Sequence, residues 1–156
     1  TGMRRADREV TAKEDISAIM EKCDAVSVAF AGETPYVIPM SFGFEWTDEC
    51  PTLYLHGAGE GEKVSRMRRD DRVAFSMYAG TSVVGGATAC AYSATYESVC
   101  GSGRIAPLSG EEKRHALEVL MRQYAKDRTF TFDDRMLAAV NVWKIDVCQI
   151  SGKRRT

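Results

Sequence analysis

The sequence predicts an α+β fold that is mainly β: a closed or split barrel of about six strands with helices inserted between them. Two observations carry this prediction. Extended apolar segments recur between residues 25 and 150, with amphipathic helical segments between some of them. The first two extended segments follow each other directly, joined by a short turn, as antiparallel strands are. A doubly wound parallel sheet is disfavoured, because it needs regular alternation of strand and crossover helix.

Helices are predicted where apolar residues recur at a spacing of three and four. The first helix has Ile16, Ile19, Met20 and Cys23 on one face. It opens with a Thr-x-x-Glu pattern at Thr11, and the third helix opens with the equivalent pattern at Ser109, so each is predicted to have a capping box. The four predicted helices cover residues 11–23, 60–70, 109–124 and 133–139.

Strands are predicted where bulky and β-branched residues form short runs bounded by turn residues. The fifth run is long, and Gly101 and Gly103 within it predict a break or a bend. No internal repeat interrupts this pattern. The six predicted strands cover residues 25–31, 36–46, 51–56, 72–78, 90–108 and 140–150.

The second predicted strand has two unlike faces. Tyr36 and every second residue after it to Trp46 are bulky, whereas the residues between them are mostly small or polar. Pro39 cannot donate to a strand ladder and Gly43 weakens a strand, so both suggest a bulge, an edge or a ligand. A flat ligand fits against the small face, which contains Ser41 and Gly43, and tight strand packing is the alternative explanation.

The size and composition indicate one globular domain. The chain has 156 residues, 28% of them charged, and a formal net charge of −1. This balance disfavours a nucleic-acid partner. We expect the domain to cover residues 3–156, with Thr1 and Gly2 fitting a cloning scar. No apolar run approaches the roughly 20 residues of a membrane helix, so a cytoplasmic protein without a membrane partner is expected.

The cysteines and histidines do not predict a metal site. The five cysteines are odd in number and scattered, which fits free thiols in a reducing compartment. The two histidines lie far apart and form no HExxH motif. His115 falls on the early part of a predicted helix, and a surface or packing role is expected for it, as for a lone helical histidine without acidic partners.

The turn LYLHGAGEGEK, residues 53–63, is the strongest candidate for a binding site. A strand ends in His56, and Gly57, Gly59 and Gly61 lead into a helix that carries Lys63. Backbone N–H groups at a helix N-terminus bind anions when no side chain obstructs them. An ordinary flexible turn is the alternative. The dinucleotide and Walker patterns both fail here, so any phosphate would belong to another kind of nucleotide.

Five motifs in order resemble one family. They are MRRADREVT, PYVIPMSFGFEW, LYLHGAGEGEKVSRMRRDDRVAF, YESVCGSGRI and VWKIDVCQISGKRR. Together they resemble the FMN-binding split-barrel proteins related to pyridoxamine phosphate oxidase, and within them the nitroimidazole-resistance (Nim-like) flavoproteins. The resemblance implies a six-stranded antiparallel split barrel with flanking helices. It also implies a homodimer that binds FMN in a cleft at the subunit interface.

The resemblance also implies which residues bind the cofactor. The isoalloxazine ring would lie along Pro39, Met40, Ser41, Phe42 and Gly43. The ring and ribityl chain would also meet His56, Gly57 and Ala58, and the phosphate would meet Gly61 and Lys63. Tyr96 and Ser98 would lie near the cofactor, at its phosphate end. Many family members have a basic residue where this chain has Glu62, which would compete with an anion at the helix N-terminus.

The expected function is an FMN-dependent oxidoreductase. A reduced nicotinamide would supply electrons and a small organic molecule, such as a nitro-aromatic compound, would accept them. His56 is the expected catalytic residue, since an imidazole beside the flavin can hydrogen-bond the ring or deliver a proton. A strand-end histidine bound to backbone carbonyls is the alternative for that residue. For the protein, the alternatives are a flavin-binding module without turnover and a relative that uses another phosphorylated cofactor.

Overall fold

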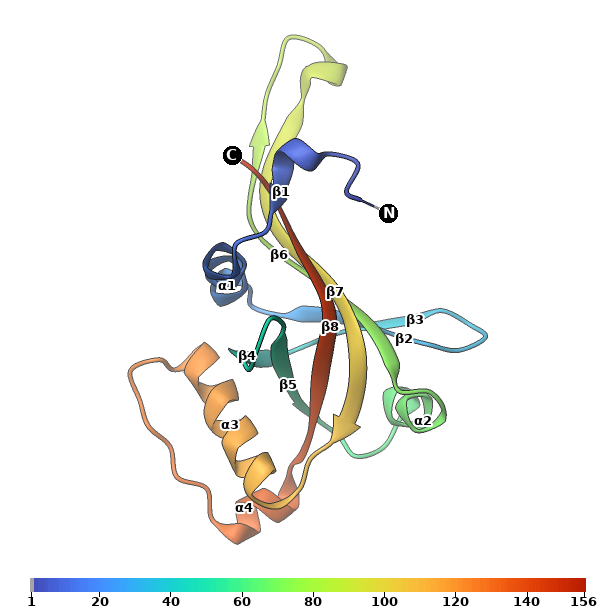
Figure 1. Ribbon diagram of the computed structural model, residues 1–156, viewed down its shortest axis with the longest axis vertical. Coiled ribbons are helices and arrows are strands. Elements are labelled where there is room, and N and C mark those ends of the chain that lie inside the picture. Colours follow the sequence, from blue (N-terminus) through green and yellow to red (C-terminus); the bar gives the residue numbers. More distant parts are fainter. Residues whose placement is uncertain (1) are drawn as a thin grey trace.

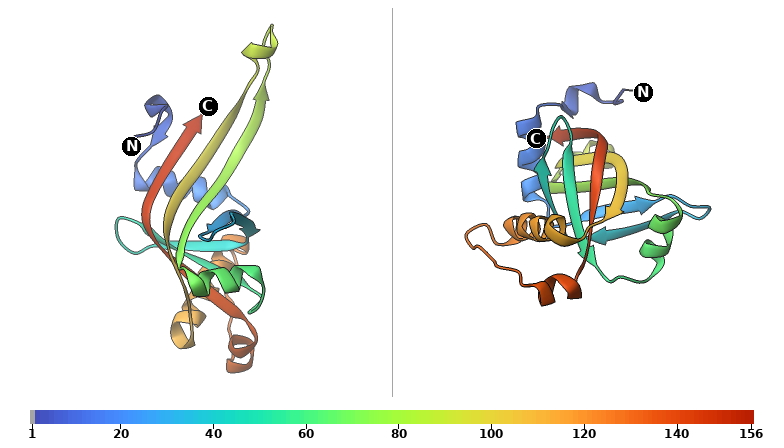
Figure 2. Two further views of the ribbon diagram at one scale, coloured as in Figure 1. Left: turned by 90° about the vertical axis from the view of Figure 1, so that its right-hand side faces the viewer. Right: turned by 60° about the horizontal axis from the view of Figure 1, so that its bottom comes forward.

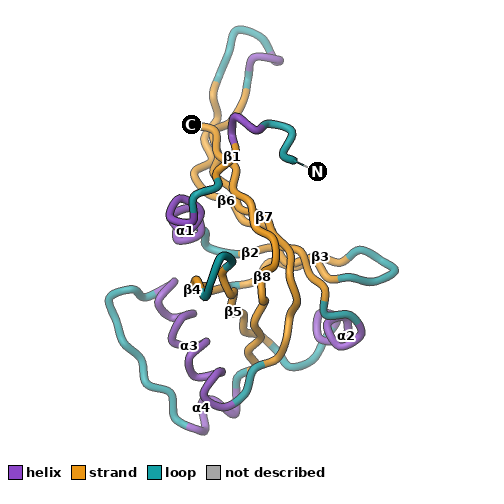
Figure 3. The backbone as a smooth tube through the Cα atoms, in the orientation of Figure 1, coloured by secondary structure: helices purple, strands orange, loops and turns teal. Residues whose placement is uncertain are grey.

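The structure, a computed structural model, describes residues 2–156. The predicted helices are all present, and two short 3₁₀ turns accompany them (Figures 1 and 3). The helices are α1 (Lys13–Lys22), α2 (Glu62–Arg69), α3 (Gly110–Tyr124) and α4 (Asp134–Ala139). The 3₁₀ turns cover Ala6–Arg8 and Ala89–Ala91.

Each predicted strand is also present, and the strand of residues 36–46 is divided in two. The strands are β1 (Glu9–Val10), β2 (Val26–Phe30), β3 (Tyr36–Met40), β4 (Phe42–Trp46), β5 (Pro51–Gly57), β6 (Arg72–Val84), β7 (Ser93–Pro107) and β8 (Asn141–Arg155). β1 is an addition of two residues that pairs with β8.

One antiparallel sheet contains all these strands, in the order β3-β2-β6-β7-β8-β5-β4, with β1 beside β8. The two ends of this order, β3 and β4, are consecutive in the chain and only Ser41 separates them. The chain joins these two strands but they do not pair with each other, so the sheet stays open there while its strands curve around a common interior (Figure 2, right). This is the split barrel that the sequence predicts.

The division at Ser41 changes the partner of the predicted second strand. Its first half pairs with β2, from Val26↔Met40 onward, and its second half pairs with β5, from Phe42↔Leu55 onward. Pro39 lies in β3, a terminal strand of the sheet, where a missing N–H is tolerated. Of the explanations for Pro39 that the sequence left open, an edge strand is the one the structure shows.

Two hydrophobic clusters support the barrel. The larger one fills the interior, and the bulky residues of β3 and β4 belong to it or pack against it. The smaller one lies between the outer side of β5 and β8 and the helices α3 and α4, and includes Tyr54, Leu120 and Val142. Helix α3 thus covers one outer face of the barrel (Figure 1).

The hairpin of β6 and β7 extends well beyond the barrel and forms an arm (Figures 1 and 2). The sequence predicts that β6 ends at Tyr78, but the strand continues to Val84. Tyr78, Val83, Val84 and Tyr92 are exposed along the arm. The bend predicted near Gly101 and Gly103 is a register shift against β8, between Ser102 and Gly103.

The predicted capping boxes are not formed among the described residues. Helix α1 begins one residue later than its Thr-x-x-Glu pattern requires, with Ala12 as N-cap. Ser109 is the N-cap of α3, but its side chain makes no capping hydrogen bond there. The Ser/Thr-x-x-Glu pattern therefore predicts where both helices start, although neither helix has the capping hydrogen bond from its N-cap side chain. Within residues 2–156 no helix is both long and apolar enough to cross a membrane.

Candidate functional site

The predicted phosphate site lies where β5 leaves the sheet and α2 begins (Figure 1). β5 is buried from Pro51 to Leu55 between the interior and α3. Its last two residues, His56 and Gly57, emerge at the end of the strand, where they still pair with β8. A rigid strand therefore holds the start of the glycine-rich turn in place.

The three glycines of the turn serve two purposes. A Cβ on Gly57 would lie 3.3 Å from Cε of Lys63, and a Cβ on Gly59 would lie 2.8 Å from Nδ2 of Asn141. Gly61 has a φ of +117°, which L side chains rarely adopt, and a Cβ there would meet open space. The turn can therefore receive a ligand at Gly61, whereas Gly57 and Gly59 make room for the protein's own side chains.

The N-terminus of α2 has the features of an anion site. Gly61 is its N-cap and, as a glycine, supplies no side chain to cap it. The first intrahelical bond runs from the Ser65 N–H to the Gly61 carbonyl, 3.1 Å long, so the N–H groups of the preceding turn have no helical acceptor. Lys63 Nζ donates to the Ala58 carbonyl at 3.4 Å and lies 5.6 Å from the centre of the Trp143 ring. Open backbone donors and an ammonium group thus occur together.

His56 lies beside this turn but on a different face. Its imidazole is exposed, and by strand alternation it points to the side of Tyr54, whereas Gly57 and Lys63 lie toward Trp143. Because Phe42 pairs with Leu55, Ser41 and His56 are the next residues in that ladder. The ladder itself ends at the Phe42–Leu55 pair, so Ser41 and His56 follow it without pairing. The imidazole and the ammonium lie on opposite faces of the end of β5.

Several other groups of the predicted ring site are already buried or hydrogen-bonded within the protein. The side chains of Met40 and Phe42 are buried in the interior cluster. The Phe42 N–H donates to the Tyr124 hydroxyl at 2.8 Å. A Cβ on Gly43 would lie 2.8 Å from Leu120 Cα and from the Val119 carbonyl oxygen, so α3 already fills the small face there. Tight packing, the alternative that the sequence left open, accounts for Gly43.

Tyr96 and Ser98 are remote from the turn within one chain. They pair with Arg155 and Lys153 of β8, whereas His56 pairs with Val142. Counted along β8, the 11 to 13 residues between these positions span about 35–45 Å at the rise of an extended strand. Arg8 and Lys153 lower the pKa of Tyr96, because these cations favour its phenolate form. Within one chain, Tyr96 and Ser98 therefore pair with the opposite end of β8 from His56.

A polar cluster that the sequence did not predict joins α3 to the barrel. The Tyr54 hydroxyl donates to Glu45 Oε1 at 2.7 Å, and His115 Nε2 lies 2.6 Å from the same oxygen. Burial raises the pKa of Glu45, but the two hydrogen bonds outweigh it, so the net pKa is lowered. Burial and the bond to Glu45 raise the pKa of Tyr54. The expectation that His115 has no acidic partner is wrong, because α3 brings it to a residue 70 positions away.

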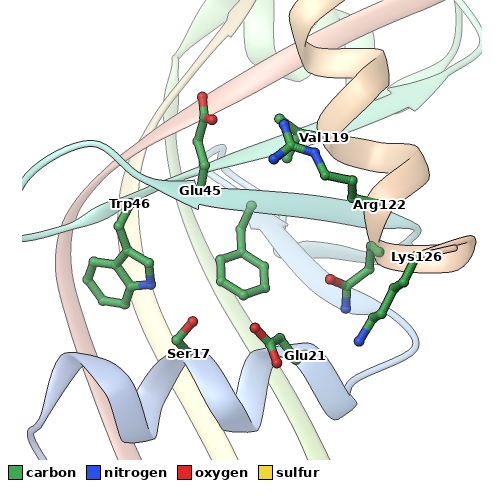
Figure 4. Close-up of a pocket in the computed structure, with 9 residues that line it drawn as sticks. Ser17, Glu21, Glu45, Trp46, Val119, Arg122 and Lys126 are labelled. Atoms are coloured by element: carbon green, nitrogen blue, oxygen red, sulfur yellow. The ribbon is translucent and has the colours of Figure 1, made fainter. Parts of the chain in front are cut away.

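A separate cleft of about 400 Å³ opens between α1, β4 and α3 (Figure 4). Ser17 and Glu21 project into it from α1, Arg122 lines it from α3, and Lys126 lines it from the segment just after α3, while Trp46 lies on β4 (Figure 4). None of the predicted site residues lines this cleft, and the sequence carried no signal for it.

Comparisons with known proteins identify relatives of the whole chain. A family model described as pyridoxamine 5'-phosphate oxidase matches residues 12–154. The crystal structure of a candidate 5-nitroimidazole antibiotic resistance protein from Bacteroides thetaiotaomicron is 36% identical, with a TM-score of 0.79 over 94% of this chain and 86% of that one. No curated protein is similar enough to count as a match.

More distant structures share the fold. The flavocytochrome Anf3 from Azotobacter vinelandii is 19% identical, with a TM-score of 0.79 over 99% of this chain and 72% of that one. The FAD and heme binding protein from Mycobacterium smegmatis is 21% identical, with a TM-score of 0.78 over 94% and 73%. At these identities the likeness extends to the fold alone.

Proposed function

The chain belongs to the pyridoxamine 5'-phosphate oxidase family, and we propose that it binds FMN and acts as an oxidoreductase on a small organic acceptor. The uncapped N-terminus of α2 carries this proposal. Gly61 leaves open space at its Cα, the first-turn N–H groups have no helical acceptor, and Lys63 adds a positive charge. Such a cradle suits the phosphate of a mononucleotide.

Each residue at the end of β5 has a part in this proposal. The first turn of α2 and Lys63 would hold the phosphate, and Gly57 and Ala58 would line the path to the ring. FMN supplies the two-electron chemistry between a reduced nicotinamide and the acceptor. The exposed His56 imidazole would deliver a proton to an acceptor bound beside the ring. Because the side chain of His56, from β5, and that of Lys63, from α2, lie on opposite faces of the end of β5, the cofactor would pass around the end of the strand.

We also propose a homodimer with the cofactor at the interface. Tyr96 and Ser98 of one subunit would then complete the site of the other, since they are remote from His56 within one chain. The exposed apolar residues of the β6–β7 arm suit a protein partner. A row of small residues pairs across four neighbouring strands and would allow the second subunit to approach the sheet closely. The row consists of Ser27, Ser76, Cys100 and Ser151.

The acceptor class rests on sequence similarity. The candidate 5-nitroimidazole resistance protein is 36% identical over most of both chains, which favours a nitro-aromatic acceptor here. Fold alone does not determine a substrate, so more distant relatives add no weight to this choice.

Flavin binding is the first test. The purified protein should take up FMN, measured by quenching of flavin fluorescence, and release it on denaturation. Lys63→Ala should weaken FMN binding about ten- to a hundredfold, since a hydrogen bond to a charged group contributes about 1.5–3 kcal/mol. Lys113→Ala on α3 is the matched control and should leave the affinity unchanged. Failure to bind any flavin would refute the proposal.

Turnover is the second test. A reduced nicotinamide should bleach the bound flavin, and a nitro-aromatic compound should restore its colour. If FMN binds but no nicotinamide reduces it, the protein is a flavin-binding module and the oxidoreductase proposal fails. Mass measurement by light scattering checks the dimer, and a monomer that binds FMN with full affinity would contradict the shared site.

A further inference from the structure

Glu62 places a negative charge at the entrance of the proposed phosphate site. It is the first residue of α2, directly after Gly61, and its side chain is 50% exposed. Lys63, the cation of the site, follows it immediately. Without a compensating charge, the Glu62 carboxylate would repel a phosphate and would itself interact with the positive N-terminus of the helix. Something else in the chain must offset it if the site binds an anion.

Arg66 meets that requirement one turn later. Its Nε donates to Glu62 Oε1 at 2.7 Å, and only 10% of its side chain is exposed. Pairing with a residue four positions onward draws the carboxylate along the helix, away from the N–H groups of the first turn. The guanidinium and the carboxylate carry opposite unit charges, so the pair is neutral overall.

The guanidinium is held from two further sides. Nη1 donates to the Thr34 carbonyl, and Nη2 donates to Thr34 Oγ1 at 3.3 Å. The group also lies 4.9 Å from the centre of the Tyr36 ring. The turn between β2 and β3 therefore fixes Arg66 in one geometry, and Glu62 is the only carboxylate among the described residues that it contacts.

We infer that Arg66 is a positioning residue for the phosphate of the cofactor, acting by neutralising Glu62 and holding it clear of the N-terminus of α2. This inference rests on the proposed flavin site. It explains how an anion site would tolerate an acid as the first residue of α2.

Without Arg66, the Glu62 carboxylate should repel the phosphate of FMN. Arg66→Ala should weaken FMN binding about tenfold, the order of effect of a unit charge several ångströms from an anion near a protein surface. The double variant Arg66→Ala/Glu62→Gln should recover the wild-type affinity, because it removes the repelling charge as well. Riboflavin, which lacks the phosphate, should bind all three proteins equally well. Arg69→Ala removes the same charge from the far end of the helix and should change the FMN affinity less than twofold.

The experiment is a set of equilibrium titrations of flavin-free protein with FMN and with riboflavin. Circular dichroism confirms folding of each variant, and Arg66→Gln replaces Arg66→Ala if the latter does not fold. An FMN affinity unaffected by loss of Arg66 would overturn the inference. So would an affinity that falls without rescue by Glu62→Gln, since that marks a purely structural role. If the wild-type protein binds neither flavin, the flavin proposal itself has failed, and this inference falls with it.

Discussion

Gly43→Ala tests whether the small face of the second predicted strand serves packing or the cofactor. The new Cβ would lie 2.8 Å from Leu120 Cα, 2.8 Å from the Val119 carbonyl oxygen and 2.9 Å from the Leu120 nitrogen. All three are backbone atoms of α3, so no side-chain rotation relieves the contact. The helix must move as a unit, and with it the contacts that Tyr54 and Val142 make in the smaller cluster.

The expected loss follows from this geometry. Overpacking of a core commonly costs about 1–3 kcal/mol, which lowers the melting temperature by about 2–12 °C for a domain of this size. Urea unfolding of the flavin-free protein, followed by circular dichroism, measures the free energy of unfolding. Gly57→Ala is the matched control, because its Cβ would meet the flexible end of Lys63 at 3.3 Å and the Trp143 ring at 3.7 Å, an ordinary van der Waals distance. It should change the stability by no more than about 0.5 kcal/mol.

The result that refutes the packing explanation is equally specific. If Gly43→Ala unfolds at the same urea concentration as wild type but loses FMN, the absent side chain serves the cofactor. If it loses stability and retains FMN affinity once folded, α3 is the reason for the glycine.

Three further predictions concern other parts of the molecule. His56→Ala should bind FMN normally and lose turnover in a nitroreduction assay, and unchanged turnover would remove His56 from the mechanism. The lowered pKa of Glu45 means that its contribution to stability is present above pH ~4.3, the ordinary value for a glutamate, and is lost as the pH falls below it. Glu45→Gln should therefore show a flatter acid limb in unfolding experiments between pH 6 and 3, and equal limbs would contradict the bonding to Tyr54 and His115. Burial raises the pKa of Cys23 to about 11, so in native protein at pH 8 a thiol reagent should label the exposed Cys90 long before Cys23, as read by peptide mass spectrometry.

Local features of the chain are predictable because local chemistry causes them. Apolar residues at helical spacing locate α1 and α3, and turn residues bound the strands, so the order of elements follows from the sequence. The same is true of the turn at residues 53–63, since a strand, a run of glycines and a helix start are adjacent in the chain. The sequence alone therefore identifies the N-terminus of α2 as a candidate anion site.

Contacts between distant segments were decided by the tertiary structure alone. No periodicity reveals that α3 crosses Gly43, that His115 meets Glu45, or that Thr34 and Glu62 share Arg66. The same holds for the distance between Ser98 and His56, which depends on register along β8. Sequence patterns report which face of an element is buried, whereas the residue that covers that face is selected by packing over the whole chain.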